Sequence, residues 1–186
     1  IWNYWVNNYL LGNKPPAFDI LAWNADTTRL PAQLHADYLD LVELNPFMKP
    51  NNMQVAGEWI DMSKVQVGAY VVGGTTDHIT PWKGCYGTAR LLGEDSTFVL
   101  SNAGHLQSFI NPPGSKKSFF YAGAAKQDDA RHWLENAGEQ QLGSWWPHWR
   151  NWIQQRSGEE ISAPKKAGSR RYPALCAAPG TYVLEK

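Results

Sequence analysis

Cysteine is scarce in this sequence, and neither sign of charge is in excess. The two cysteines, Cys85 and Cys176, are too few for a disulfide scaffold, and no Cys-x-x-Cys pair offers a metal knuckle. Lysine and arginine together number 17, as do aspartate and glutamate, so the chain lacks the basic surplus of general nucleic-acid or anionic-membrane binders. No apolar run approaches the roughly 20 residues of a membrane span. The low cysteine content favours a reducing compartment.

Aromatic residues are abundant by contrast. Ten tryptophans occur in 186 residues, and 43% hydrophobic against 18% charged residues is typical of a folded domain or a large part of one. The chain opens at Ile1 inside a Trp-rich amphipathic stretch, and no signal-peptide pattern precedes it. We therefore expect the chain to be a piece of a longer protein that begins inside a domain.

The first third of the chain has helical patterning. Residues 1–12 (IWNYWVNNYLLG) predict a helix that ends at a glycine, and residues 30–44 predict a second helix closed by Asn45-Pro46. A short apolar run covers residues 18–23. Residues 45–57, rich in proline, asparagine and glycine, are typical of a long surface connection.

The middle of the chain predicts a βαβ unit. Residues 65–72 (VQVGAYVV) are β-branched and apolar on both faces, residues 80–92 begin with Thr-Pro as helices often do, and residues 97–100 (TFVL) form a second buried strand. Such a unit is a parallel pair with a right-handed crossover. Beyond it we expect helices at 128–140 and 144–157 and an extended tail from residue 163. The predicted class is α/β, with a mostly parallel sheet and flanking helices.

Two titratable residues follow the two strands of this unit. Asp77 comes after the first strand and His105 after the second. The carboxyl ends of neighbouring parallel strands lie roughly 4.8 Å apart, so the carboxylate and the imidazole are expected within hydrogen-bond reach. A carboxylate there would hold one imidazole nitrogen protonated and leave the other as a base, which is the orienting half of a catalytic triad. A turn-forming aspartate and an ordinary histidine remain the alternative interpretation.

A nucleophile for such a triad is missing from the sequence. In α/β hydrolases the nucleophile precedes the acid and the histidine, on a G-x-[SC]-x-G elbow, and residues 1–76 contain no such elbow. Cys85, in KGCYG, lacks the first glycine and lies within the predicted helix, where we expect a small buried hydrophobe. Cys176 lies in the tail. The nucleophile is therefore expected upstream of Ile1.

Long, unusual strings in the chain resemble one family. NYWVNNYLLG, PPAFDILAWNADTTRLP, VVGGTTDHITPWKGCY, LSNAGHLQSFINPPG and GSWWPHWRNWIQQRSGE are similar to the carboxyl-terminal half of the polyhydroxyalkanoate synthases, and the ending APGTYV resembles the medium-chain-length type. The resemblance implies an α/β-hydrolase core with a Cys-Asp-His triad. It also implies an acyltransferase that polymerises (R)-3-hydroxyacyl-CoA into polyester and releases coenzyme A.

The resemblance assigns roles to particular positions. Asp77 matches the acid of the family's D-H-I-x-P-W motif, and His105 matches its histidine, with Ala103 in place of the usual serine. His78 is a competing imidazole with a supporting role, and Trp23 falls in the family's W-N-x-D stretch. No metal and no cofactor beyond the acyl-CoA substrate are implied.

The resemblance also implies a domain organisation and a location. Residues 1–57 would be the end of a cap that helps form a homodimer, 58–162 the second half of the hydrolase core, and 163–186 an extended tail. The expected location is the cytoplasm, at the surface of polyester storage granules.

Two other functions remain open. An ester or thioester hydrolase would use water in place of the hydroxyacyl acceptor, and a serine elbow upstream would favour it. A non-catalytic Trp-rich module that coats an apolar granule is the other, favoured by a start codon near Ile1. In the helix predicted at 144–157, we expect Trp145, Trp149 and Trp152 to pack on the sheet. Trp146, on another face, is a candidate exposed anchor.

Overall fold

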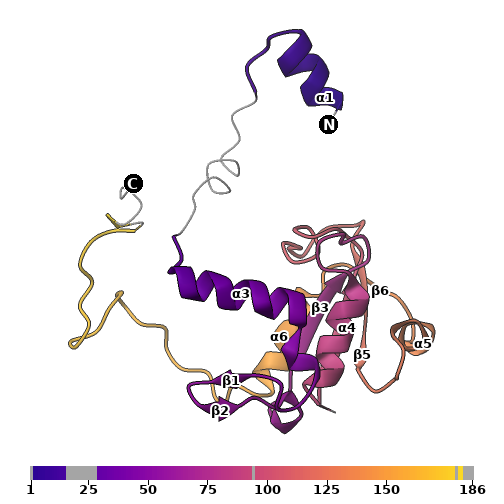
Figure 1. Cartoon of the computed structure of the whole chain (residues 1–186), viewed down its shortest axis with the longest axis vertical. Helices are drawn as coiled ribbons and strands as arrows, with labels where there is room; N and C mark the ends of the chain where they lie inside the picture. The colour runs from indigo at the N-terminus through magenta and orange to yellow at the C-terminus, as the bar shows by residue number, and fades with distance from the viewer. Residues whose placement is uncertain (1, 16–28, 94, 179, 182–186) are drawn as a thin grey trace. The chain divides into compact units, whose positions relative to one another are not determined.

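The computed structural model describes residues 2–15, 29–93, 95–178 and 180–181 of the chain. The chain divides into two compact units, Ile1–Val65 and Gln66–Lys186 (Figure 1). The domain boundaries predicted after residues 57 and 162 remain predictions.

The smaller unit contains both helices expected near the start of the chain. The first turn, α1 (Trp2–Tyr4), continues into a π-helical segment, η1 (Trp5–Leu10), and Gly12 has a positive φ of 67° where the helix has ended. Helix α3 (Ala32–Leu44) ends at Asn45, whose left-handed conformation stops it before the short 3₁₀ turn η2 (Pro46–Met48). The predicted apolar run at 18–23 lies outside the described residues.

A small hairpin occupies part of the predicted surface connection. Strands β1 (Gln54–Val55) and β2 (Glu58–Trp59) pair antiparallel, and the 3₁₀ turn η3 (Met62–Lys64) follows them. The two residues between the strands, Ala56 and Gly57, have φ of 52° and 87°, which is the backbone that two-residue hairpin turns require. The connection is therefore more ordered than its composition indicates.

The larger unit contains the predicted βαβ unit. Strand β3 (Tyr70–Gly74), helix α4 (Trp82–Leu91) and strand β4 (Thr97–Ser101) follow one another, and the two strands pair in parallel from Tyr70↔Thr97 to Gly74↔Ser101. Figure 1 shows α4 alongside β3. The predicted parallel pair is confirmed.

The bounds of β3 differ from the prediction of 65–72. The strand begins at Tyr70 because its partner β4 begins at Thr97, preceded by a turn in which the Ser96 N–H donates to the Gly93 carbonyl. Residues 65–69 thus have no strand to pair with among the described residues. The hydrophobic pattern of one segment cannot predict the first residue of its strand, because the length of the partner strand determines it.

The segment after β4 was predicted to be helical only, and this is wrong. Strand β5 (Phe119–Ala124) pairs antiparallel with β4, and β6 (Gln141–Leu142) pairs antiparallel with β5. In the described residues the sheet order is β3-β4-β5-β6, so the sheet is mixed rather than mostly parallel. The aromatic, apolar FFYAGA string is the signal that could have identified β5.

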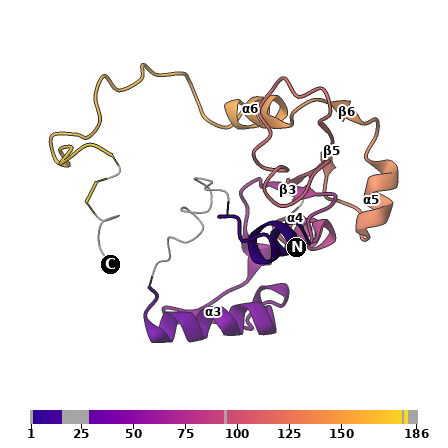
Figure 2. The same ribbon diagram turned by 90° about the horizontal axis from the view of Figure 1, so that it is seen from above.

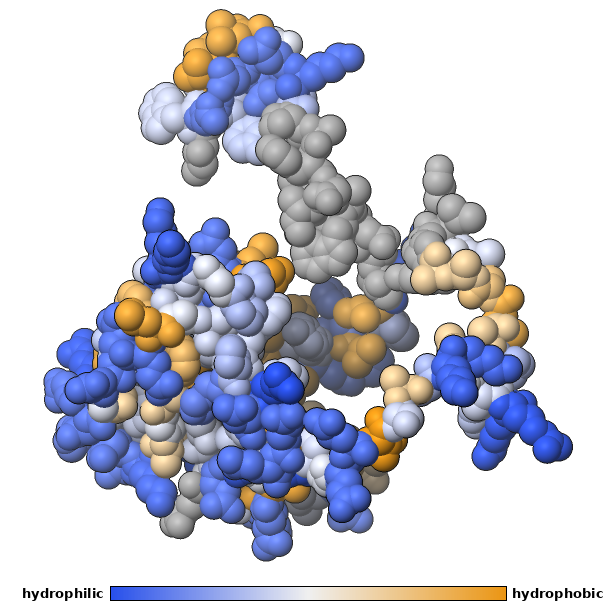
Figure 3. Space-filling view, turned by 180° about the vertical axis from the view of Figure 1, so that it is seen from behind, coloured by the Kyte–Doolittle hydropathy of each residue, from blue (hydrophilic) through white to orange (hydrophobic). Residues whose placement is uncertain are grey.

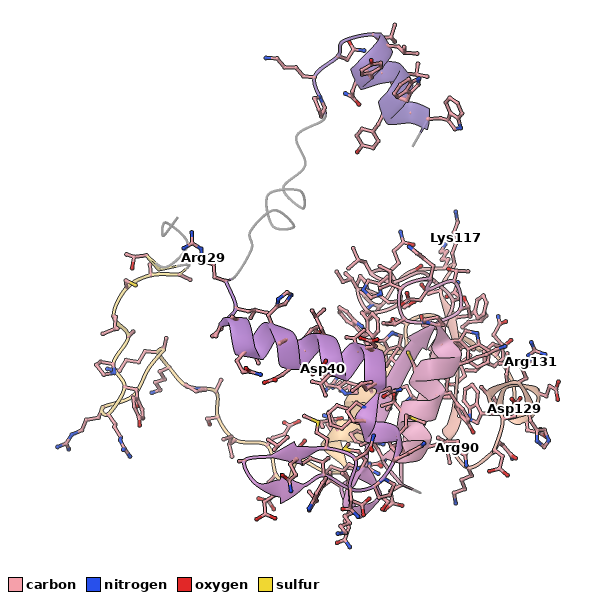
Figure 4. All side chains as sticks on the ribbon, in the orientation of Figure 1. Arg29, Asp40, Arg90, Lys117, Asp129 and Arg131 are labelled. Carbon is pink, nitrogen blue, oxygen red and sulfur yellow. The ribbon has the colours of Figure 1, made fainter. Side chains whose placement is uncertain are left out.

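Helix α5 (Ala130–Asn136) is shorter than the predicted 128–140. Asp129 caps its start by accepting the backbone N–H groups of Arg131 and His132, and both Asp129 and Arg131 are labelled in Figure 4. The helix ends before Gly138, whose φ is 78°, and the chain then joins the sheet as β6. Residues 137–140, the last of the predicted helix, form the turn that leads into β6.

The core of the larger unit has two halves, one on each face of the sheet. Phe98 and Leu100 of β4 pack with Tyr86 of α4 and Trp133 of α5, whereas Val99, which alternates with them, packs with Trp145 at the start of α6 (Trp146–Gln154). Figure 2 shows α4 and α6 on opposite sides of the sheet. The unit is thus a helix–sheet–helix sandwich of the predicted α/β class.

The tail and the surface of the larger unit complete the description of the fold. From residue 163 the described tail is extended, with one isolated bridge between Gly168 and Pro173. On the face shown in Figure 3 the larger unit is mostly hydrophilic, with hydrophobic residues in small separate groups. No helix among the described residues is both long enough and apolar enough to cross a bilayer.

Candidate active site

Asp77 lies in a tight turn at the carboxyl end of β3. One carboxylate oxygen, Oδ1, accepts the backbone N–H groups of Ile79 and Thr80, both at 2.9 Å. The other, Oδ2, accepts the Thr80 hydroxyl at 2.7 Å and His105 Nδ1 at 2.9 Å. The Asp77 side chain is only 1% exposed, so these four donors replace the water that the carboxylate has lost.

The same contacts determine the ionisation of Asp77. Burial alone would raise its pKa, but hydrogen bonds from the Thr80 N–H and hydroxyl, from His105 and from the Ile79 N–H outweigh that effect. The net pKa lies well below the ordinary range of an aspartate. Asp77 is therefore an anion at neutral pH, and it can hold a proton on the facing imidazole nitrogen.

His105 lies in the loop that follows β4. Its Nδ1 donates to Asp77 Oδ2, which leaves Nε2 as the acceptor nitrogen, and the side chain is 38% exposed. The sequence-based expectation that the strands bring Asp77 and His105 within hydrogen-bond reach is confirmed. Their catalytic role remains a prediction.

Close packing between the two loops fixes this geometry. A Cβ on Gly74, the last residue of β3, would lie 2.7 Å from the Ala103 carbonyl oxygen and closer still to Ser108 Oγ. The backbone N–H groups of Thr75 and Thr76 donate to the carbonyls of Ser101 and Ala103. Backbone hydrogen bonds thus hold the residues just before Asp77 against the residues just before His105.

Asparagine side chains hold the far end of the His105 loop. Asn102 accepts the Phe119 N–H at 2.7 Å and donates to the Lys117 carbonyl at 2.9 Å, and Asn111 accepts the Ser118 hydroxyl at 2.9 Å. Lys117 is labelled in Figure 4, at the end of the sheet where β3 finishes. The loop therefore returns to the sheet at a defined point, where β5 begins.

Other predicted residues take no part in the dyad. His78 is exposed, and no hydrogen bond from its side chain is found within the described part of the chain. Trp23 lies outside the described residues. Cys85 is half-buried on α4 against the core, its thiol donates to the Thr80 carbonyl at 3.7 Å, and burial raises its pKa, so it has the surroundings of a structural cysteine.

Thr80 is the site residue that sequence reasoning assigned wrongly. The Thr-Pro pair predicted that the helix begins at Thr80, but α4 begins at Trp82 without a side-chain cap, and Thr80 supplies two of the four hydrogen bonds to Asp77 instead. The spacing Asp-x-x-Thr was an available signal, since aspartate commonly bonds backbone groups two and three residues ahead.

The described residues contain no group of three or more metal-ligating side chains.

The tryptophans of α6 differ from the predicted arrangement. Trp145 is 9% exposed and belongs to the core, and Trp152 is half-buried with its ring edge-on to Tyr70 at 5.3 Å, both as expected. Trp149, expected to pack on the sheet, is 44% exposed. Trp146, the predicted exposed anchor, is half-buried and donates its indole N–H to the Phe109 carbonyl. Trp146 is less exposed than predicted because its indole, like that of Trp145, bonds the main chain of the loop that carries His105.

Comparison with known proteins agrees with the geometry. A family model described as alpha/beta hydrolase fold matches residues 1–112, which is more than half of the 186 residues. The chain belongs to the α/β-hydrolase fold family. The matched segment of this α/β-hydrolase chain contains both Asp77 and His105.

Relatives are similar over the whole chain. Poly(3-hydroxyalkanoate) polymerase 2 of Ectopseudomonas oleovorans is 53% identical over 186 residues, and polymerase 1 of the same organism is 52% identical. A poly(3-hydroxyalkanoate) polymerase subunit of Cupriavidus necator is 39% identical over 187 residues. All three alignments cover 100% of this α/β-hydrolase chain but only 32–33% of the relative. The chain thus spans about a third of the length of the curated relatives it matches.

Proposed function

We propose that this chain is part of a polyhydroxyalkanoate synthase, an acyltransferase that polymerises (R)-3-hydroxyacyl-CoA with release of coenzyme A. The observation that carries the proposal is the 2.9 Å hydrogen bond between Asp77 Oδ2 and His105 Nδ1. It joins the carboxyl ends of two parallel strands in an α/β-hydrolase chain whose relatives are named poly(3-hydroxyalkanoate) polymerases. The nucleophile of the proposed triad is a cysteine outside these 186 residues.

His105 is the proposed general base, and Asp77 holds it in the working orientation. With Nδ1–H directed at the Asp77 carboxylate, Nε2 presents a lone pair to solvent or to a substrate. The low pKa of Asp77 keeps the carboxylate negative, so it stabilises the imidazolium that forms when Nε2 takes a proton. Asp77 itself stays unprotonated throughout the cycle.

The proposed reaction has two acyl transfers. In the first, His105 Nε2 takes the thiol proton, the thiolate attacks the thioester carbonyl, and the tetrahedral intermediate expels coenzyme A, which receives the proton. In the second, Nε2 takes the proton of a 3-hydroxyl group, and the oxygen attacks the cysteine-bound acyl group. A C–O bond forms as the C–S bond breaks, and the imidazolium returns its proton to the departing cysteine sulfur. A thiol is much more acidic than an alcohol, and its thiolate is a strong nucleophile near neutral pH, so the base contributes most to the second transfer.

The partners and location follow from this activity. The proposed partners are an (R)-3-hydroxyacyl-CoA and the growing polyester, and the reaction calls for no cofactor besides the CoA thioester. Residues 1–57 are proposed to belong to a cap that takes part in a homodimer. The proposed location is the cytoplasmic surface of polyester granules.

The test uses the full-length protein that carries this sequence. With (R)-3-hydroxyacyl-CoA we expect free thiol to appear together with polyester, and His105→Gln to lower the rate of both by about 10²- to 10⁴-fold at unchanged fold. Iodoacetamide should inactivate the protein, since the proposed nucleophile is a thiol. Free 3-hydroxy acid in place of polymer would identify a hydrolase, and absence of thiol release would leave a non-catalytic module.

A further inference from the structure

Three consecutive residues before and at the start of α6 donate hydrogen bonds to the loop that carries His105. The Trp145 indole N–H donates to the Ser108 carbonyl at 2.7 Å, and the Trp146 indole N–H donates to the Phe109 carbonyl at 2.9 Å. The Ser144 hydroxyl donates to the Asn111 carbonyl. We call residues 144–146 the α6 clamp, because each supplies one side-chain donor to the main chain of residues 108–111.

The α6 clamp bonds a segment that is not held by the backbone hydrogen bonds of a helix or a sheet. Residues 102–118 contain turns but no helix or strand, and within them the Ser108 N–H donates to the Gly104 carbonyl at 3.0 Å. That bond closes the turn that contains His105. A displacement of Ser108 is therefore passed on to His105 through one turn of backbone.

Ser108 is held from both sides. It is fully buried, with its Cβ and Oγ against Gly74 of β3 and its carbonyl bonded to Trp145. Gly74 is also the acceptor for the Asp77 N–H, at 3.2 Å. Ser108 thus connects the clamp on one side with the Asp77 turn on the other.

We propose that Trp145 and Trp146 are positioning residues for His105, with their indole N–H groups setting the register of the His105 loop against Asp77. This inference rests on the proposed function, because it is measured through turnover. The two aromatic rings by themselves would only pack against the loop. Each indole also has a single N–H donor, and because each donor bonds one main-chain carbonyl, the two bonds fix the position of the loop along the ring edges.

The test replaces each indole by phenyl in the full-length protein. Trp145→Phe and Trp146→Phe keep an aromatic ring and remove the N–H. We expect kcat to fall by about 10- to 100-fold with KM little changed, because a shift of about 1 Å in a catalytic group costs rate rather than ground-state binding. Trp146→Phe is the safer variant for folding, since Trp146 is less buried than Trp145.

Two tryptophans on the same helix are matched controls. Trp149 is exposed, and the buried indole N–H of Trp152 has no hydrogen-bond partner among the described residues. Trp149→Phe and Trp152→Phe should therefore leave kcat close to that of the wild type. Trp152→Phe also removes a half-buried indole, so it reports the effect of lost ring contacts, including that of the Arg156 guanidinium 4.1 Å from the ring centroid, without the loss of a hydrogen bond to the His105 loop.

A double-mutant cycle with Asp77→Asn separates positioning from general loss of stability. If the clamp acts by keeping His105 against Asp77, Trp146→Phe should cost little more in kcat once Asp77 is gone. Fully additive losses, or a loss of kcat in Trp152→Phe equal to that in the clamp variants, would overturn the inference. If the wild type releases no coenzyme A, the proposed function fails and this inference with it. An active wild type with unaffected Trp145→Phe and Trp146→Phe overturns the inference alone.

Discussion

Gly74 and Ser108 are in such close contact that no side chain can stand between them. Gly74 ends β3, three residues before Asp77, and Ser108 lies three residues after His105. The Ser108 side chain occupies the space that a Cβ on Gly74 would need. The distance between the carboxylate and the imidazole therefore depends on a glycine at the strand end.

Gly74→Ala is expected to separate Asp77 from His105. The new methyl group would lie 2.7 Å from the backbone oxygen of Ala103, and backbone cannot rotate away as a flexible side chain can. The His105 loop must move, so we expect both a lower thermal midpoint and a loss of kcat of at least about 10-fold. Differential scanning fluorimetry and coenzyme A release measure the two effects.

A second glycine provides the control for this substitution. Gly87, inside α4, has no described atom within 4 Å of an added Cβ. Gly87→Ala should stabilise the protein by about 0.5–1 kcal/mol, since alanine is the better helix former, with kcat unchanged. Equal losses in both alanine variants would contradict the role assigned to Gly74.

Asp77→Asn is expected to keep the fold and remove activity. An asparagine oxygen can still accept the N–H groups of Ile79 and Thr80, but its NH₂ group would face the Thr80 hydroxyl and His105 Nδ1. The neutral imidazole would then present an unprotonated Nδ1 to the asparagine NH₂ group. Its proton would lie on Nε2, which could no longer act as the base. We expect kcat to fall by about 10²- to 10⁴-fold. A circular dichroism spectrum like that of the wild type, together with normal activity, would disprove the assignment.

The two neighbouring imidazoles are expected to respond differently. His105→Gln removes the proposed base and should lower kcat by about 10²- to 10⁴-fold. His78→Gln, one residue from Asp77, should change kcat by less than about threefold, because the His78 side chain is exposed and has no hydrogen bond in the described structure. Parallel rates of polymer formation for the two variants test this; equal losses would mean that His78 takes part in the reaction.

The pairing of Asp77 with His105 could be predicted because it depends on local patterns. Two buried apolar runs flank a helix, and parallel pairing brings the residues after each run to one edge of the sheet. Both the strands and their parallel pairing can be predicted without knowledge of distant parts of the chain. The same reasoning excluded Cys85, which is on a helix as expected.

The contacts that fix the pair could not be predicted in the same way. The contact of Gly74 with Ser108 and the bond from Trp145 to the Ser108 carbonyl join segments 34 and 37 residues apart, which no periodicity connects. Strand β5 was missed because the apolar run 119–124 was not weighed against a partner strand. With β5 missed, its partner β6 was missed as well, while the bounds of α5 are set locally by the Asp129 cap and by Gly138, whose φ is 78°.

The last prediction concerns stability on the opposite face of the sheet from α4. The Tyr70 hydroxyl of β3 bonds His148 Nδ1 of α6 at 2.8 Å, and the His148 ring packs edge-on to Phe120 of β5. Burial lowers the pKa of His148 and raises that of Tyr70, so the tyrosine is the donor and the neutral imidazole the acceptor.

Because the pKa of His148 is lower in the folded chain, the unfolded chain binds the proton first as the pH falls. The free energy of unfolding should therefore decrease below the ordinary histidine pKa of about 6.5 and level off below the folded pKa. His148→Gln retains an acceptor for Tyr70 and cannot titrate, so its unfolding free energy should fall less steeply between pH 7 and pH 5. Tyr70→Phe should lower the unfolding free energy by about 1 kcal/mol at neutral pH. Urea unfolding of the three proteins across this range measures both effects; identical slopes for wild type and His148→Gln would mean that His148 is protonated as readily in the folded chain as in the unfolded one.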